Sequence, residues 1–194
     1  MEKLTHLLTD DEKRRLKIVH LHKNEILFNE GDQCLNIGLV FRGELKIVSY
    51  LENGVEIIYN IIKEQQMFGN NLIFSSDPTF RGDVIANTES YLYLIPKERL
   101  LELLRENQEF LIGYLNAQSD FGKSLNLNIK LLTLNNAKER ILYYLKTNQD
   151  KIEFKSITDL AKQLFLTREV LSRTLHNLER EHIISIKDKT ITKI

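Results

Sequence analysis

Residues 156–194 read SITDLAKQLFLTREVLSRTLHNLEREHIISIKDKTITKI and contain the most regular apolar pattern of this chain. Apolar residues recur every three or four positions over 157–165 and again over 168–180, which indicates two short amphipathic helices. Thr167 is a favourable N-cap residue for the second helix. Alternating residues over 184–192 then predict a small β-hairpin. Two helices around a tight turn, followed by a hairpin, are typical of a winged helix-turn-helix.

The second of these helices turns polar side chains away from its apolar face. Arginine can donate two hydrogen bonds to a guanine, and glutamate can accept one from the amine of a cytosine. We therefore expect this helix to read bases in the major groove of DNA, through Thr167, Arg168, Glu169, Ser172, Arg173 and His176. The pattern leaves open the alternative of an ordinary solvated charged face. Phe165 fits poorly, because it lies in the tight turn where a glycine would be easiest.

Composition and charge narrow the class of protein. The chain has 194 residues, 42% hydrophobic and 28% charged, which is enough for one large or two small domains. No signal-like stretch and no run of about 18 apolar residues occurs, so we expect a cytoplasmic protein with no membrane partner. The net charge is zero, but residues 137–194 hold 12 Lys and Arg against 8 Asp and Glu. A basic excess on the expected reading domain favours attraction to phosphates.

The sequence predicts no cofactor. The single cysteine, Cys34, excludes an intramolecular disulfide and an iron–sulfur cluster held by about four thiolates. A redox role for Cys34 stays open, although nothing basic flanks it. Haem also stays open through His20 and His22, which alternate onto one strand face; such histidines are more often packing or surface residues, and we expect no metal site.

Short strand-like runs broken by turns fill much of residues 18–95. Asn53-Gly54 between two alternating runs is a strong hairpin signal. Many short strands at regular spacing predict a β-sandwich or a β-roll. We therefore expect an α+β chain whose first domain, residues 1–108, is a β-roll of the jelly-roll kind.

A long apolar series with a period near 3.5 follows the strands, and such a period is typical of coiled coils. We expect a dimerisation helix over 109–134 whose stripe pairs two copies of the chain. Its members are Leu111, Gln118, Phe121, Leu125, Ile129 and Leu132. The same stripe could instead pack back on the β-roll. Asn135-Asn136 predict a break and an N-cap, so that residues 135–194 form a DNA-binding domain.

This order of parts resembles the bacterial Crp/Fnr family of transcription regulators. Arg42-Gly43-Glu44-Leu45-Lys46-Ile47 and Met67-Phe68-Gly69 resemble turns of the family's β-roll, and Leu171-Ser172-Arg173-Thr174-Leu175 resembles its reading motif. The resemblance implies a cyclic-nucleotide-binding-like sensor domain ahead of the dimerisation helix.

In the catabolite-activator branch of that family the recognition helix carries Arg-Glu-x-x-x-Arg, which Arg168, Glu169 and Arg173 match. The resemblance therefore implies a homodimer that reads double-stranded DNA with a palindrome of TGTGA-like half-sites. It implies an activator or a repressor, with RNA polymerase as a further candidate partner.

The resemblance fails at the nucleotide pocket. Members that bind cyclic AMP follow Phe-Gly with a glutamate for the ribose and later present Arg-Ser-Ala to the phosphate, whereas this chain has Asn70 and then Phe80 at those places. An aromatic side chain gives no charge compensation for a buried anion, so we expect no binding of cyclic AMP. A one-residue loop shift would return Arg81 to the pocket. The candidate effector pocket comprises Phe68, Gly69, Asn70, Asn71, Leu72, Phe80, Arg81, Gly82, Leu125 and Asn126.

The function expected is sequence-specific DNA binding by a regulator whose effector, if one exists, is an unidentified small molecule. Two alternatives stay open: a regulator that depends on cyclic AMP or another small ligand, and a protein-interaction module that does not bind DNA. An enzyme is not expected, because the sequence has no Gly-rich phosphate loop ahead of a helix and no nucleophile motif.

Overall fold

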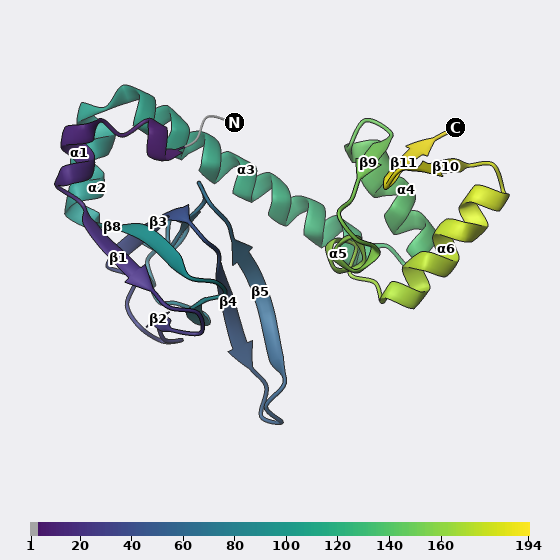
Figure 1. The fold of residues 1–194 in the computed structure, drawn as a ribbon, viewed down its shortest axis with the longest axis horizontal. Helices are drawn as coiled ribbons and strands as arrows, with labels where there is room; N and C mark the ends of the chain where they lie inside the picture. Colours follow the sequence, from purple (N-terminus) through teal and green to yellow (C-terminus); the bar gives the residue numbers. More distant parts are fainter. Residues whose placement is uncertain (1–3) are drawn as a thin grey trace. The chain divides into compact units, whose positions relative to one another are not determined.

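The structure is a computed structural model that describes residues 4–194. It divides into two compact units, Met1–Asp120 and Phe121–Ile194. Figure 1 shows the strand-rich first unit in purple to teal and the second unit in green to yellow. The division falls inside α3, Gln108–Thr133. No helix within residues 4–194 is both long and apolar enough to cross a membrane.

The first unit is built on two four-stranded sheets whose pairs are all antiparallel. One sheet has the order β1-β8-β3-β6, with bounds Lys17–Leu21, Ser90–Pro96, Asn36–Arg42 and Met67–Phe68. The other has the order β2-β7-β4-β5, with bounds Ile26–Phe28, Asp83–Ala86, Leu45–Tyr50 and Glu56–Ile62. One apolar core joins both sheets. The predicted α+β class with an N-terminal β-roll is confirmed.

Turn chemistry places the strands of this unit as predicted. Gly54, with a φ of 79°, turns the chain between β4 and β5, and the Asn53 side chain accepts a hydrogen bond from Val55 N–H at 3.1 Å. At Gly43, which has a φ of 92°, a Cβ atom would lie 2.4 Å from the carbonyl oxygen of Glu89. The turn between β3 and β4 therefore requires glycine.

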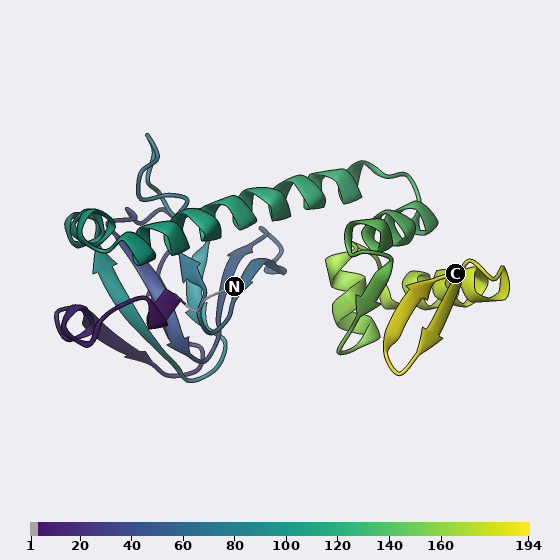
Figure 2. The same cartoon turned by 90° about the horizontal axis from the view of Figure 1, so that it is seen from above.

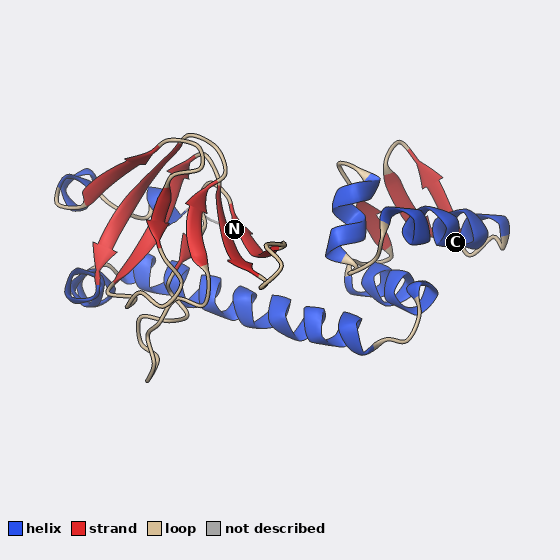
Figure 3. Cartoon of the chain, turned by 90° about the horizontal axis from the view of Figure 1, so that it is seen from below, coloured by secondary structure: helices blue, strands red, loops and turns tan. Residues whose placement is uncertain are grey.

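Helices lie on one side of the β-roll, and the first half of α3 passes across it (Figure 3). They are η1 Leu4–His6, α1 Asp10–Arg14, α2 Lys97–Glu106 and the start of α3. Asn107, between α2 and α3, accepts a hydrogen bond from Phe110 N–H at 2.9 Å and donates one to Leu7 O at 2.8 Å. This amide ties the corner between the two helices to the N-terminal segment.

The second unit is a winged helix-turn-helix, as the sequence predicts. After α3 it contains α4 Ala137–Thr147, β9 Lys151–Glu153, α5 Ile157–Gln163, α6 Arg168–Arg180, β10 Ile184–Lys187 and β11 Thr190–Lys193. The Asn136 side chain caps α4 by accepting from Glu139 N–H at 2.9 Å. Figure 2 shows the hairpin β10–β11 in yellow beside the helices.

The second unit contains one strand, β9, that the sequence did not predict. β9 pairs with β11 and places Ile152 opposite Ile191, so that the wing is a three-stranded sheet of order β10-β11-β9. Both isoleucines are buried in the core of the unit. Three residues are too few to show an alternation, and for this reason the pattern gave no signal.

Candidate nucleic-acid interface

The helix-turn-helix is held by two capped helices and one apolar face. Ser156 caps α5 by accepting from Asp159 N–H at 3.1 Å, and Thr167 caps α6 by accepting from Val170 N–H at 3.2 Å. Each cap satisfies a backbone donor that the helix start leaves unpaired. Three leucines of α6 are buried in the core of the unit: Leu171, Leu175 and Leu178. Their burial fixes which face of α6 points to solvent.

All six residues predicted to read DNA are exposed on α6 or at its N-cap. They are Thr167, Arg168, Glu169, Ser172, Arg173 and His176. Within residues 4–194, the side chains of Ser172, Arg173 and His176 form no hydrogen bond or ion pair. The donors and acceptors of these three side chains are therefore available to an outside partner.

Glu169 is held as a carboxylate at the start of α6. Hydrogen bonds from its own backbone N–H and from the Thr167 side chain, together with the positive charge of Arg168, lower the pKa of the Glu169 carboxyl group. The N-terminal end of a helix also favours negative charge. An ionised carboxylate is a pure hydrogen-bond acceptor, which is what a cytosine amine needs.

The turn between α5 and α6 is strained at Phe165. This residue has a φ of 53°, and its side chain is 41% exposed. The left-handed conformation costs a non-glycine residue about 1–2 kcal/mol. The turn closes through Phe165 N–H to Lys162 O at 3.1 Å and Leu166 N–H to Ala161 O at 2.9 Å. The poor fit that the sequence indicated at Phe165 is therefore present as backbone strain.

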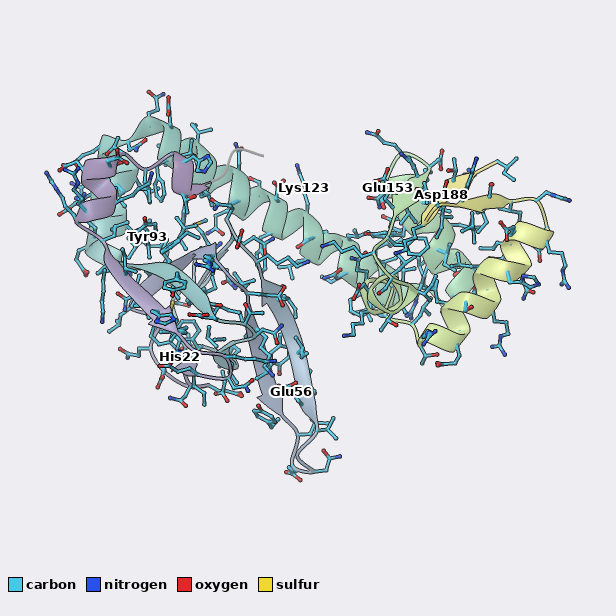
Figure 4. All side chains as sticks on the ribbon, viewed as in Figure 1. His22, Glu56, Tyr93, Lys123, Glu153 and Asp188 are labelled. Carbon is cyan, nitrogen blue, oxygen red and sulfur yellow. The ribbon has the colours of Figure 1, made fainter. Side chains whose placement is uncertain are left out.

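The wing carries basic residues that the sequence reading did not assign. Asp188 and Lys189 turn the hairpin with φ values of 49° and 61°, which matches a two-residue hairpin turn with both central residues at positive φ. Asp188 lies at the tip of the wing (Figure 4). Lys187 and Lys189 are exposed on either side of Asp188. These lysines flank a hairpin turn that the sequence predicts, and this pattern was the signal by which they could have been assigned.

In the candidate effector pocket, Phe80 is part of the apolar core. Its side chain is 2% exposed and stacks on Phe28 with ring centroids 4.8 Å apart. Arg81 is exposed and pairs with Asp77. The loop shift that would return Arg81 to the pocket is thus not the arrangement observed.

The loops at residues 30–32 and 80–83 are bonded to each other. Gly31 N–H donates to Phe80 O at 2.9 Å, and Phe80 N–H donates to Asp32 O at 3.0 Å. The Asp83 carboxylate accepts from Glu30 N–H at 2.7 Å. The chain itself therefore satisfies these backbone donors.

The other predicted pocket residues do not share one environment. Phe68, Gly69, Asn70 and Gly82 are buried, Leu72 is half-buried, and Asn71 is exposed. Leu125 and Asn126 are exposed on the part of α3 that belongs to the second unit. Of the buried members, Phe68 and Phe80 lie near each other, with ring centroids 6.5 Å apart, whereas Asn70 bonds to Gln118 and Gly82 lies against Val48.

The predicted dimer stripe divides into two kinds of residue. Gln118 donates its Nε2–H to Asn70 O at 2.8 Å and accepts from Asn70 Nδ2–H at 2.5 Å, so this side chain is engaged within the chain. Leu111 and Phe121 are half-buried. Leu125, Ile129 and Leu132 are 44%, 60% and 55% exposed. The three exposed residues form an apolar surface at the far end of α3.

The histidines and the cysteine lie in ordinary surroundings. His20 stacks on Tyr91 with centroids 4.3 Å apart, bonds to Glu89 at 3.0 Å, and meets His22 edge-on. His22 is labelled in Figure 4. Within residues 4–194 no group of three or more His, Cys, Asp or Glu side chains is arranged to hold a metal ion. Burial raises the pKa of the Cys34 thiol to about 11.

Comparisons with known proteins agree with this architecture. The sequence matches the family of cyclic nucleotide-binding domains over residues 18–107. The structure of a transcriptional regulator from Thermotoga maritima is 30% identical in sequence, with a TM-score of 0.58, and the match covers 64% of this chain and 98% of that chain. The catabolite activator protein of Thermus thermophilus has a TM-score of 0.57 at 19% identity, over 100% of this chain and 94% of that chain.

The chain belongs to the Crp/Fnr family. A curated relative, the global nitrogen regulator of Nostoc sp., is 24% identical over 182 residues, which cover 88% of this chain and 82% of the relative. The resemblance to the Crp/Fnr family that the residue motifs indicated is thereby confirmed. The fold is that of a Crp/Fnr-type transcription regulator, with a cyclic nucleotide-binding domain and a winged helix-turn-helix.

Proposed function

We propose that this chain is a non-catalytic transcription regulator that binds a palindrome of TGTGA-like half-sites as a homodimer, in the cytoplasm. The observation that carries the proposal is the surface of α6, where Arg168, Glu169 and Arg173 are exposed at the spacing of the catabolite-activator motif. Arginine to guanine and glutamate to cytosine are pairings that discriminate bases in the major groove. Lys187 and Lys189 on the wing would supply phosphate contacts that position the helix without reading sequence.

The exposed apolar end of α3 supports the homodimer. Leu125, Ile129 and Leu132 recur at spacings of four and three, the pattern by which two helices pack as a coiled coil. A two-fold dimer places two recognition helices on successive major grooves about one helical turn apart. A palindromic site follows from this symmetry, and RNA polymerase is a further candidate partner at a promoter.

We propose that cyclic AMP is not the effector. A cyclic phosphate needs a cation or aligned donors, and Phe80 offers neither. The backbone donors of the neighbouring loops are already used by Asp83 and by the carbonyls of Asp32 and Phe80. The effector is then a different small molecule, or the protein acts without one. Neither haem nor an iron–sulfur cluster is part of the proposal.

The test is a selection of random duplexes on the purified protein without ligand, at two salt concentrations. Recovery of a palindrome whose binding weakens steeply with salt supports the proposal, because phosphate contacts release counterions. If no sequence is enriched, even after cyclic AMP or cell extract is added, the chain is an interaction module instead. Enrichment only with cyclic AMP contradicts the proposal for the effector alone.

Two arginines of α6 provide a matched pair for base reading. Arg173→Ala should cost roughly 1–3 kcal/mol of binding and relax the preference at one position of each half-site. Arg180→Ala removes the same charge from the last turn of the same helix, where Arg180 is also exposed. Arg180→Ala should weaken binding to all sequences about equally, and by less than Arg173→Ala weakens binding to the palindrome. An unchanged base preference in the Arg173 variant would contradict the assignment.

A further inference from the structure

One arginine on α4 joins three backbone carbonyls of the second unit. Arg140 donates through Nη1 to Phe165 O at 2.7 Å and to Leu164 O at 3.4 Å. Its Nε and Nη2 both donate to Leu134 O at 3.3 Å. Every acceptor is a main-chain oxygen, and no carboxylate within residues 4–194 pairs with this guanidinium. A half-buried guanidinium that donates hydrogen bonds only to main-chain carbonyls indicates a role in holding the backbone.

Two of those carbonyls belong to the strained turn that leads into the recognition helix. Leu164 is the C-cap of α5, and Phe165 follows it with a φ of 53°. The N–H groups of Phe165 and Leu166 close the turn on α5, in the pattern of a Schellman motif. That motif satisfies donors but leaves the last carbonyls of the turn for other partners. Arg140 is the partner that they have.

The same turn normally takes glycine, which adopts positive φ without a steric cost. Here a phenylalanine occupies the position with its ring 41% exposed, so burial of the ring gives limited compensation for the strain. A hydrogen bond from a charged donor to Phe165 O offsets part of that cost, since charge-assisted bonds are stronger than neutral ones. Strained backbone persists only where its surroundings determine it.

We infer that Arg140 is a positioning residue of the second unit. Its guanidinium holds the backbone of the Leu164–Phe165 turn in place and so sets the direction in which α6 leaves this turn. The consequence for DNA binding rests on the proposed function. Through Leu134 O, the first carbonyl after α3, the same side chain also ties this turn to the end of the long helix. The planar guanidinium suits this task, because its donors point in several directions, whereas a lysine ammonium is a point charge.

Four variants of the full chain test this inference. Arg140→Gln removes the clamp, by which we mean the hydrogen bonds from the guanidinium to the three main-chain carbonyls. Lys138→Gln is the control, because Lys138 lies on the same helix, carries the same charge and only pairs with Glu181 at the surface. Phe165→Gly removes the strain, and the double variant Arg140→Gln with Phe165→Gly asks whether glycine makes the clamp unnecessary. Circular dichroism establishes that each variant is folded.

The first measurement is hydrogen exchange of the Leu166 amide in the DNA-free protein, since this N–H closes the turn on Ala161 O. We expect exchange in Arg140→Gln to be at least about tenfold faster than in Lys138→Gln. The double variant should return most of the way to the parent, because glycine adopts the turn without help. Equal exchange in the Arg140 and Lys138 variants overturns the inference.

The second measurement is the ratio of affinities for the selected palindrome and for random duplex. We expect this ratio to fall at least about tenfold in Arg140→Gln and to change less than about twofold in Lys138→Gln, because a misdirected helix loses base contacts while both variants lose one charge. A ratio equal in the two variants overturns the role in DNA reading.

The two measurements separate this inference from the proposed function. A parent protein that selects no palindrome refutes the proposed function, while the exchange of Leu166 still decides whether Arg140 holds the turn. If Arg140→Gln does not fold, Arg140→Lys replaces it. The lysine variant should exchange faster than both the parent and a folded Phe165→Gly, Arg140→Lys double variant measured in parallel; parent-like exchange in Arg140→Lys overturns the need for the fork of donors.

Discussion

At the scale of single residues, Phe80 and Arg81 show how one position separates a binding role from a packing role. Phe80 is buried against Phe28, and its neighbour Arg81 is exposed and paired with Asp77 at the surface. A surface ion pair of this kind contributes little to stability. In a phosphate-binding loop the arginine would be the important side chain. Here Phe80 matters for packing of the core, and Arg81 contributes little.

We expect Phe80→Ala to lower the free energy of unfolding of the first unit by about 3–5 kcal/mol, because it leaves a cavity beside Phe28. Arg81→Ala is the control and should change stability by less than about 0.5 kcal/mol. Denaturant titration measures both. A thermal shift on addition of cyclic AMP to the parent, lost in Arg81→Ala, would contradict this assignment of the two residues.

Cys34 is expected to be unreactive at neutral pH. Burial raises the pKa of its thiol to about 11, so the nucleophilic thiolate is scarce in the folded protein. Because folding favours the neutral thiol, the stability that it contributes is present below the unfolded pKa of about 8.5 and is lost as pH rises through about 11. Alkylation at pH 8 should be at least about a hundredfold slower in the folded protein than in denaturant. Rapid alkylation of the folded protein would reopen a redox role.

At the scale of elements, the sequence predicts the helices and strands that have a regular apolar period, a recognisable cap or a recognisable turn. The start of α5 and the bounds of α6 follow from apolar spacing and from Thr167, and the hairpin β4–β5 follows from Asn53-Gly54. The end of α5 was predicted wrongly: the helix stops at Gln163 and not at residue 165, because Phe165 takes a positive φ. β9 has three residues and no period of its own. Gln118 stands at a heptad spacing, yet its amide bonds to Asn70, because a period near 3.5 does not tell which partner a stripe meets.

β9 is nevertheless expected to stabilise the second unit. Ile152 is 4% exposed and lies in the apolar core of that unit. Ile152→Ala should lower the free energy of unfolding by about 2–5 kcal/mol, whereas Lys151→Ala, at an exposed neighbouring position, should have little effect. Chemical denaturation followed by circular dichroism checks the difference. Equal stability of the two variants would mean that β9 does not pack as described.

At the scale of the whole molecule, the proposed function depends on the oligomeric state. The exposed end of α3 supplies an apolar stripe, and the proposed palindrome needs two reading heads. Since one head reads only half of a palindrome, affinity for the full site depends on the dimer.

We expect Leu125→Glu to shift the protein to a monomer and to abolish binding to the palindrome at concentrations where the parent binds, because it places a charge in the stripe. Ser124→Glu adds the same charge one residue away, off the heptad positions, and should leave the dimer intact. Sedimentation velocity and a DNA titration measure the two properties. A monomeric Leu125 variant that retains full affinity for the palindrome would contradict the dimer.

The strand order of the wing has a consequence for biosynthesis. β11 lies between β10 and β9, although it is made after both of them. Until Thr190–Lys193 have left the ribosome, the earlier strands have no partner in their sheet and Ile152 has no Ile191 to meet. The three-stranded sheet of the wing therefore assembles only when synthesis has passed this strand. A messenger truncated a few codons earlier would yield a complete β-roll with an unfinished second unit.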